Sequence, residues 1–307
     1  MTILTTNSTS AFFDRARSDM TALRKQTEKI QSQIGSQSRL ARSSDDPVAA
    51  SRLRTLARSD ALAKIDTTNA NRATSDLTIA DSTMSDITTA IARAKELATQ
   101  AANGTLSADQ RASIGKELAA IHGTLVGLAN TRDSNGNALF GGENATMAYT
   151  LDASGNAVYA GTSSSGDLPL GDGQTVTRSM TGPEFLNFKV GGVDTDLMAV
   201  VKSLSDTLQA GGADAAAVAN KTLDALSTGL DTVSTGQTVV GSRLAWIELT
   251  SDRRSNLAEL RAGEEADIGG IDPASSIARL QEMLVVLQAS QASFTKLSQL
   301  SLFNQLN

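Results

Sequence analysis

Apolar side chains recur every three or four positions along most of the chain. This is the spacing of one face of an α-helix. Five separate stripes have it, over residues 20–34, 77–98, 114–128, 226–260 and 277–300. Stripes with a common spacing let helices pack side by side, so the pattern predicts long helices in a coiled-coil-like bundle. The fourth stripe predicts one helix from about residue 213 to 262, roughly 70 Å long at 1.5 Å per residue.

Short cap sequences mark where several of these helices begin. In SSDDPVAA, Asp46 precedes Pro47, whose missing N–H costs nothing in the first turn of a helix. Asp272 and Pro273 repeat this arrangement in IDPASS. NGTLSADQ ends one helix and opens the next, with Ser107 as the expected cap. We therefore expect three helices to begin at these caps.

The helical spacing is lost between about residues 132 and 194, where Gly, Ser, Asn and Asp are frequent. Tyr149 and Leu151 precede DASGN and Val158 follows it, which predicts a β-hairpin. QTVTRSM predicts a further strand, whereas GDGQTV within the same region predicts a turn and no phosphate-binding loop. The expected fold class is mainly α with a β-rich insert, in which a long antiparallel helical bundle brackets a small β domain.

The pattern divides the chain into four expected parts. These are residues 1–40, an N-terminal amphipathic segment that is mobile in the monomer; 41–135 with 195–270, a central α-helical rod; 136–194, a β-rich outer domain; and 271–307, a C-terminal amphipathic assembly helix.

The two ends carry apolar stripes that no other part of the chain is expected to cover. Because helices bracket the insert, residues 10–35 and 275–306 should emerge together. We expect the stripes at 77–128 and 226–260 to form intramolecular core, and those of the two ends to bind other molecules. The candidate assembly residues are Phe12, Phe13, Met20, Leu23, Ile30, Ile34, Leu280, Leu284, Leu287, Phe294, Leu297, Leu300, Leu302 and Phe303.

Composition narrows the classes of function. Hydrophobic residues make up 40% of the chain and aromatic residues only 3%, which suits helix-on-helix packing. The net charge of −6 gives no basic surface for nucleic acid. There is no cysteine, which excludes disulfides and thiolate metal sites. No apolar run approaches the ~18 residues of a membrane span, and the first twenty residues lack the pattern of a Sec-type signal, so work outside the cell would need another export route.

Candidate catalytic groups are few, and we expect no enzyme and no cofactor. The single histidine, His122, is expected to occupy a solvated or flanking helical position. The acidic residues Glu264, Glu265, Asp267 and Asp272 lack the spacing of a calcium loop and indicate a solvated hinge. Trp246 is expected to be a partly buried packing residue.

Three blocks of sequence are similar to a known family. LARSSDDPVAASRLRTLARSDA at residues 40–61, IADSTMSDITTAIARAKELATQAANGT at 79–105 and IARLQEMLVVLQASQASFTKLSQLSLFNQLN at 277–307 resemble, in this order, blocks of the bacterial flagellin family. Asp45-Asp46-Pro47 and the DSNGNALFGG segment at 133–142 resemble the branch of hook-associated protein 3 within that family. Pro273 departs from the family, in which the start of the last helix is more continuous.

The resemblance implies a structural protein of the flagellum that joins hook to filament by helix-mediated polymerisation into a ring. It implies secretion through the flagellar type III channel without a cleaved signal, and an extracellular location on the flagellum, in the service of motility. The implied partners are copies of the chain itself, a neighbouring hook-associated protein, flagellin, and a cytoplasmic export chaperone on the C-terminal helix, with neither nucleic acid nor membrane.

Two other functions stay open at this point. A short filament flagellin would have the same architecture but would polymerise alone into long filaments. A secreted coiled-coil adhesin or translocator would need a larger binding domain or a membrane-length apolar segment.

Overall fold

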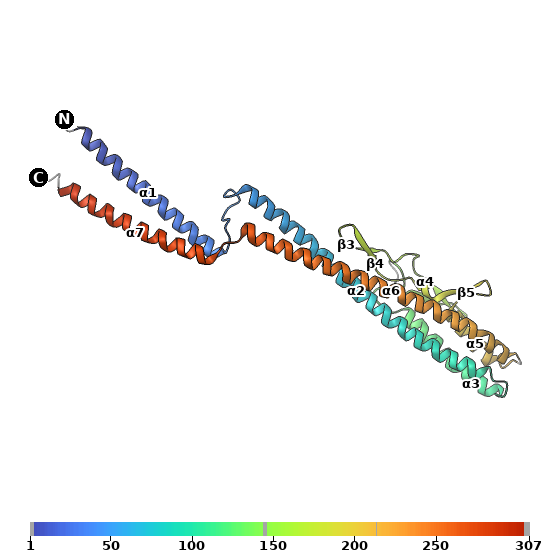
Figure 1. Cartoon of the computed structure of the whole chain (residues 1–307). Coiled ribbons are helices and arrows are strands. Elements are labelled where there is room, and N and C mark those ends of the chain that lie inside the picture. Colours follow the sequence, from blue (N-terminus) through green and yellow to red (C-terminus); the bar gives the residue numbers. More distant parts are fainter. Residues whose placement is uncertain (1–2, 144–145, 213, 304–307) are drawn as a thin grey trace. The chain divides into compact units, whose positions relative to one another are not determined.

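The computed structural model describes residues 3–143, 146–212 and 214–303; at the two ends it describes side chains from residue 11 to residue 299. The fold is mainly α with a small β region, as the sequence predicts (Figure 1). The helices are α1 (Ile3–Ser36), α2 (Pro47–Ala101), α3 (Ala108–Ala129), α4 (Gly182–Leu186), α5 (Leu197–Ala210), α6 (Ala215–Gly269) and α7 (Pro273–Phe303).

The three predicted caps are confirmed. The Asp46 carboxylate accepts a hydrogen bond from the Ala49 N–H at 3.0 Å, and α2 begins at Pro47. Ser107 forms a capping box at the start of α3. Asp272 accepts from the N–H groups of the first turn of α7, which begins at Pro273. Local sequence therefore fixes the start of three long helices.

The β region consists of three two-stranded antiparallel sheets, each a hairpin. The predicted hairpin is confirmed as β1 (Tyr149–Leu151) with β2 (Ala157–Tyr159), and the predicted strand as β4 (Gln174–Thr177). The sequence pattern did not predict β3 (Asp167–Gly171), the partner of β4. It also did not predict the hairpin formed by β5 (Asn187–Val190) and β6 (Val193–Asp196). The loop between β5 and β6 is Gly191-Gly192. Both glycines have positive φ, a backbone conformation that favours glycine in tight hairpin turns.

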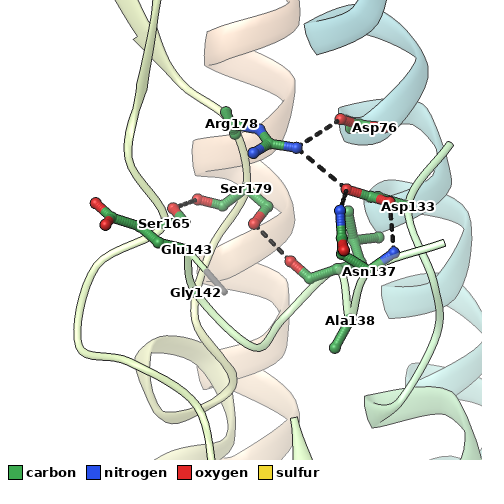
Figure 2. Close-up of a pocket in the computed structure, with 10 residues that line it drawn as sticks. Asp76, Asp133, Asn137, Ala138, Gly142, Glu143, Ser165, Arg178 and Ser179 are labelled. Atoms are coloured by element: carbon green, nitrogen blue, oxygen red, sulfur yellow. Dashed lines mark hydrogen bonds and ion pairs between the residues drawn. The ribbon is translucent and has the colours of Figure 1, made fainter. Parts of the chain in front are cut away.

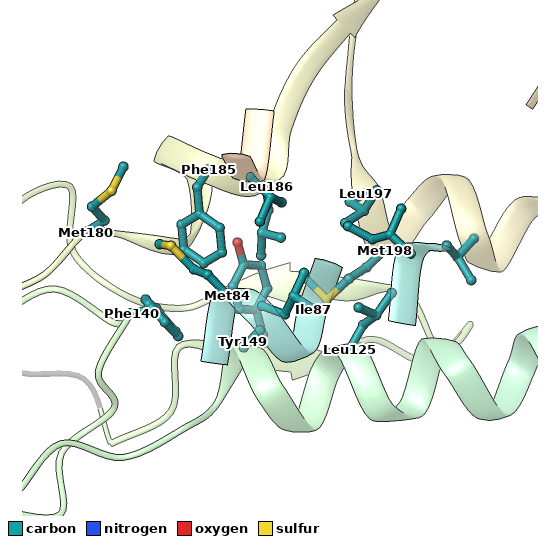
Figure 3. Packing of buried hydrophobic residues seen from close by; sticks show 14 of the residues in the cluster. Met84, Ile87, Leu125, Phe140, Tyr149, Met180, Phe185, Leu186, Leu197 and Met198 are labelled. Carbon is teal, nitrogen blue, oxygen red and sulfur yellow. The ribbon is translucent and has the colours of Figure 1, made fainter. Parts of the chain in front are cut away.

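The chain forms two compact units, which we describe separately. The core unit comprises residues 62–255 and holds the hydrophobic core. Figure 3 shows its centre, where Met84 of α2 and Leu125 of α3 lie among side chains of the β region and α5. Phe140 and Phe185 are fully buried there, with ring centroids 4.9 Å apart. The stripes at 77–128 and 226–260 contribute to this core as expected, up to Ile247.

The expected rod over residues 195–270 is interrupted. Gly211 ends α5 in the left-handed conformation, with φ of 72°, before α6 starts. Helix α5 lies along α3, and Gly115 permits the close approach, because a Cβ there would lie 2.9 Å from the Ser205 carbonyl oxygen. The Ser205 hydroxyl donates to the Gly115 carbonyl oxygen at 2.8 Å. The segment therefore folds as two helices.

The terminal unit comprises residues 1–61 and 256–307. Within it α1 and α7 lie side by side and run in opposite directions (Figure 1). The start of α2 and the end of α6 are joined by two ion pairs, Arg52 with Glu264 and Arg261 with Asp60. The hydrogen bond from Arg52 lowers the pKa of Glu264 below its ordinary value. Glu264 of the acidic group is thus an ion-pair partner of α2.

Candidate assembly surface

The seam between α1 and α7 is built by residues spaced three and four apart. On α1 the least exposed side chains recur in this rhythm from Phe13 to Ile34, and on α7 from Leu280 to Phe294. The rings of Phe13 and Phe294 meet edge to face with centroids 5.4 Å apart. This is the geometry of a two-helix coiled coil, in which each helix covers one narrow stripe of the other.

The seam leaves its own apolar residues partly exposed. Among the described side chains of α1 and α7, Thr27 alone is buried, at 5% exposure, and its hydroxyl donates to the Leu23 carbonyl oxygen. Every apolar seam residue described keeps part of its surface open, because a helix with a single neighbour can cover it on one side only. Part of the ~1.5–3 kcal/mol available from burying each Leu, Ile or Phe is therefore not realised within the chain.

The remaining surface of α7 is apolar and poor in charge. Ile277, Val285 and Leu297 are 45%, 64% and 44% exposed. Between residues 273 and 299 the only charged side chains are Arg279, Glu282 and Lys296. Soluble surfaces usually carry ~25–35% charged residues. Outside the seam, α7 thus exposes apolar side chains with few charges among them.

The predicted assembly residues fall into three groups in the structure. Those on the seam are Phe13, Met20, Leu23, Ile30, Ile34, Leu280, Leu287 and Phe294. Phe12, Leu284 and Leu297 are exposed beside it. The side chains of Leu300, Leu302 and Phe303 lie outside the described residues.

The prediction missed Ala16, Thr27, Met283 and Ser290, which also belong to the seam. Spacing of three and four from Leu280 and Leu287 selects Met283, but the run LVV that follows it offers competing phases. Ala16 and Ser290 are small, and beside them lies a groove of about 260 Å³ rimmed by Phe12, Met20 and Leu23. A side chain from outside the pair could enter this groove.

A set of contacts made by Arg39 fixes the end of α1 within the terminal unit. Its backbone N–H donates to the Gly269 carbonyl oxygen at 2.7 Å, and its guanidinium donates to the Ile268 carbonyl oxygen at 3.1 and 3.2 Å. The guanidinium also reaches Asp46 at 3.2 Å. The N–H of Ala49 and then Arg39 lower the pKa of Asp46. Arg39 thus ties the segment after α1 to the end of α6.

A second polar group lies in the core unit, where Asp76 of α2 and Asp133 face Arg178 (Figure 2). The two carboxylates are 1% and 5% exposed, and Arg178 approaches Asp133 to 3.1 Å and Asp76 to 4.0 Å. Ser134 donates its backbone N–H and hydroxyl to Asp76. The cavity between them measures about 10 Å³, the size of a single water molecule. The group therefore holds the β region against α2 and has no room for a substrate.

Replacing Arg178 should destabilise the core unit. Arg178→Met leaves two buried carboxylates without a cation, and a hydrogen bond to a charged group contributes ~1.5–3 kcal/mol. Urea unfolding followed by the fluorescence of Trp246, the only tryptophan, should show a loss of this size. The double variant Asp133→Asn/Arg178→Met should recover part of the lost stability, because one buried negative charge is removed with the cation. An unchanged urea midpoint in Arg178→Met would contradict the stabilising role of Arg178.

The expectation of a solvated or flanking His122 is wrong in part. It is buried, at 8% exposure, because α5, which the stripes did not predict, lies against α3. Burial, and next the charge of Lys202, lower its pKa, whereas Asp196 and Asp206 raise it by smaller amounts. Its Nε2 atom has no hydrogen-bond partner among the described residues.

The lowered pKa of His122 predicts a pH-dependent stability. The folded chain binds this proton less readily than the unfolded chain, so the contribution is fully present above about pH 6.5 and is lost as the pH falls below that value. The urea midpoint should therefore fall between pH 7.5 and 5.5, and His122→Leu should lose this part of the dependence. An equal slope in both proteins would show that other groups cause it.

Within the described ranges, no group of three or more His, Asp or Glu residues could hold a metal ion. In the same part of the chain, no helix is both long enough and apolar enough to cross a bilayer.

Comparison with known proteins finds similarity to flagellar proteins. Residues 8–145, which contain most of α1 and all of α2 and α3, match the model of the bacterial flagellin N-terminal helical region. Two flagellar hook-associated proteins 3 align with nearly the whole chain. The protein of Escherichia coli K12 is 29% identical over 90% of this chain and 91% of its own; that of Salmonella typhimurium LT2 is 28% identical over 98% and 99%. The chain thus contains a region similar to the flagellin N-terminal helical region, and over nearly its whole length it is similar to flagellar hook-associated proteins 3.

Solved structures agree with a flagellin-family fold. A flagellar hook-associated protein from Vibrio parahaemolyticus superposes with a TM-score of 0.67, at 20% identity, over 74% of this chain and all of its own. The flagellar junction protein FlgL from Legionella pneumophila has a TM-score of 0.59, at 15% identity, over 71% of this chain and 99% of its own. The relatives are structural proteins of the flagellum and not enzymes.

Proposed function

We propose that this chain joins the hook of a bacterial flagellum to its filament, and that it does so by polymerising through α1 and α7 into a ring of identical copies. The observation that carries the proposal is the half-covered seam of the terminal unit, in which only Thr27 is buried among the described side chains.

The energetics favour assembly over closure within one chain. Each helix residue ordered costs ~1–2 kcal/mol of backbone entropy, and isolated helices shorter than ~12–15 residues or poorly covered ones are marginal in water. Neighbouring copies would cover the sides of Met20, Leu287 and Phe294 that are still exposed, and would add a part of the ~1.5–3 kcal/mol that full burial of each provides. We therefore expect α1 and α7 to be mobile in the dilute chain and ordered in the assembly.

The partners follow from the same surface. The α1–α7 pair presents different residues on its two sides. One side of a copy can therefore bind the other side of the next copy, a heterologous contact that repeats around a ring. We propose a neighbouring hook-associated protein on one side of the ring and flagellin on the other, in line with relatives that are hook-associated proteins 3 and a structure described as a flagellar junction protein.

Export fits the properties of the chain. We propose that the protein leaves the cell unfolded through the flagellar type III channel and works outside it, on the flagellum. A chain without cysteine forms no disulfide on the way. The exposed apolar residues of α7, which would favour premature association, give a cytoplasmic export chaperone a surface to cover.

Gold labelling of flagella with an antibody to this protein tests the proposal. A thin band beside the hook, and hooks without filaments when the gene is deleted, are the expected results. Purified protein mixed with filament seeds discriminates the alternative: long filaments made of this chain alone would identify a short filament flagellin and overturn the junction role.

A further inference from the structure

The core unit carries a groove bounded by the β5–β6 hairpin, α5 and α6. Its volume is about 430 Å³, and its apolar lining is formed by Val190, Val193, Ala199, Val200 and Val218. Val193 is 69% exposed. Lys221 is the one charged side chain of the lining, and it has no ion pair among the described residues. Thr195, Ser203 and Thr222 add three hydroxyl groups to the lining, so the groove offers a protein segment apolar contacts together with hydrogen-bond partners.

The β1–β2 hairpin of the same unit carries the opposite kind of surface. Leu151 is 56% exposed and Val158 48% exposed. The register pairs Thr150 with Val158 and Leu151 with Ala157, which places Leu151 and Val158 on opposite faces of the two-stranded ribbon. Tyr149, on the face of Leu151, is buried in the chain's own core, so the exposed apolar surface of the ribbon lies at Leu151 and Val158 near the turn. Its one charged residue between positions 146 and 160 is Asp152, which is exposed at the turn.

The two surfaces lie on different sides of α5. The groove is lined by Ala199, Val200 and Ser203 of this helix. The hairpin turn lies instead at Lys202, whose Cε would be 3.5 Å from a Cβ on Gly155. At 3.6 residues per turn, Lys202 lies about 160° from Val200, about 100° from Ser203 and about 60° from Ala199 around α5. The hairpin and the groove of one chain therefore face in different directions, and two copies can bring them together.

We propose that the β1–β2 hairpin of one copy docks in the β5–β6/α5/α6 groove of the next copy, with Asp152 beside Lys221. The opposite charges of Asp152 and Lys221 favour a second copy over an unrelated partner. The contact is heterologous and repeats from copy to copy. The inference rests on the proposed ring and gives its outer layer a specific lateral contact, separate from the α1–α7 pair.

Cysteine cross-linking tests the docking, because the chain has no cysteine of its own. A full-length Val158→Cys/Val193→Cys variant should form a ladder of oligomers when flagella carrying it are treated with an oxidant or a short bis-maleimide. A disulfide needs Cβ atoms within ~3.5–4.5 Å, so the bond reports direct contact. Each single variant, and a Val158→Cys/Ser85→Cys control with its second cysteine on the exposed side of α2, should give no ladder.

The outcomes separate the docking from the junction role. Gold labelling at the junction without a ladder, from this pair or from Val158→Cys/Val200→Cys, overturns the docking and leaves the junction role intact. A ladder in protein that labels the filament or no part of the flagellum supports the docking and overturns the junction role. Val193→Asp should lower the yield of assembled protein at least tenfold while the Trp246 unfolding transition stays unchanged; unaltered assembly would also overturn the docking.

Discussion

A chain that lacks residues 287–307 should fold but should not assemble. The deletion removes Leu287, Phe294 and Leu297, each worth ~1.5–3 kcal/mol when fully buried, or about 4.5–9 kcal/mol in all. Part of this burial is already made with α1 of the same chain, and the remainder is made between copies. Because ~1.4 kcal/mol is tenfold in an equilibrium constant, the affinity between copies should fall more than ~10-fold. Co-sedimentation with purified hooks measures this. A truncated chain that still builds onto hooks would refute the role of α7.

The folding of the truncated chain is checked separately. All residues of the hydrophobic core lie between Ala70 and Ile247, so the Trp246 unfolding transition should be unchanged by the deletion. Leu287→Asp should also abolish assembly by placing a charge in the seam. Thr124→Asp puts the same charge on an exposed position of α3 and should assemble as the unmodified chain does. Loss of assembly in both variants would point to a general effect of charge.

Replacing Phe185 should have the largest effect on stability. Its side chain is fully buried against Phe140, and its Cβ lies so near α6 that a Cβ on Gly236 would be 2.9 Å from it. Phe185→Ala should lower the free energy of unfolding by ~3–5 kcal/mol, through lost burial and the cavity that remains. Urea unfolding followed by Trp246 should show a lower midpoint at an unchanged slope.

Phe12→Ala is the matched control for this substitution. Phe12 is 52% exposed in the terminal unit. Its removal should leave the unfolding midpoint of the core unit unchanged and weaken assembly. The two variants thus separate the intramolecular core from the surface between copies. The distinction between intramolecular core and surface between copies is wrong if Phe185→Ala lowers the free energy of unfolding by less than ~1 kcal/mol. It is also wrong if Phe12→Ala lowers the free energy of unfolding of the core unit by as much as Phe185→Ala does.

The sequence predicts the features that local chemistry determines. Asp46, Ser107 and Asp272 cap helices through bonds to residues two or three positions away, so their roles are visible in short stretches. The long stripes of α2 and α6 predict core positions because only one face of each is apolar. The β1–β2 hairpin is visible from its turn sequence DASGN.

Features that depend on distant contacts escape sequence reasoning. Arg39 binds Ile268, 229 residues away, and nothing around either residue indicates this. His122 is buried by α5, a helix too short to form a long stripe. On the C-terminal helix, apolar residues at consecutive positions 283–287 permit several phases, so Met283 was missed and Leu284 was included. The strands of β5 and β6 have four residues each, too few for a clear alternation.

Amide hydrogen exchange tests the central claim most directly, namely that α1 and α7 gain their stability from other copies. In the dilute, isolated chain the amides of Phe13–Ile34 and Leu280–Phe294 should exchange rapidly while those of α2, α3 and α6 in the core unit are protected. In the assembled state the same terminal amides should become protected. Strong protection of both terminal helices in the dilute chain would contradict the account and would indicate a self-contained helix pair.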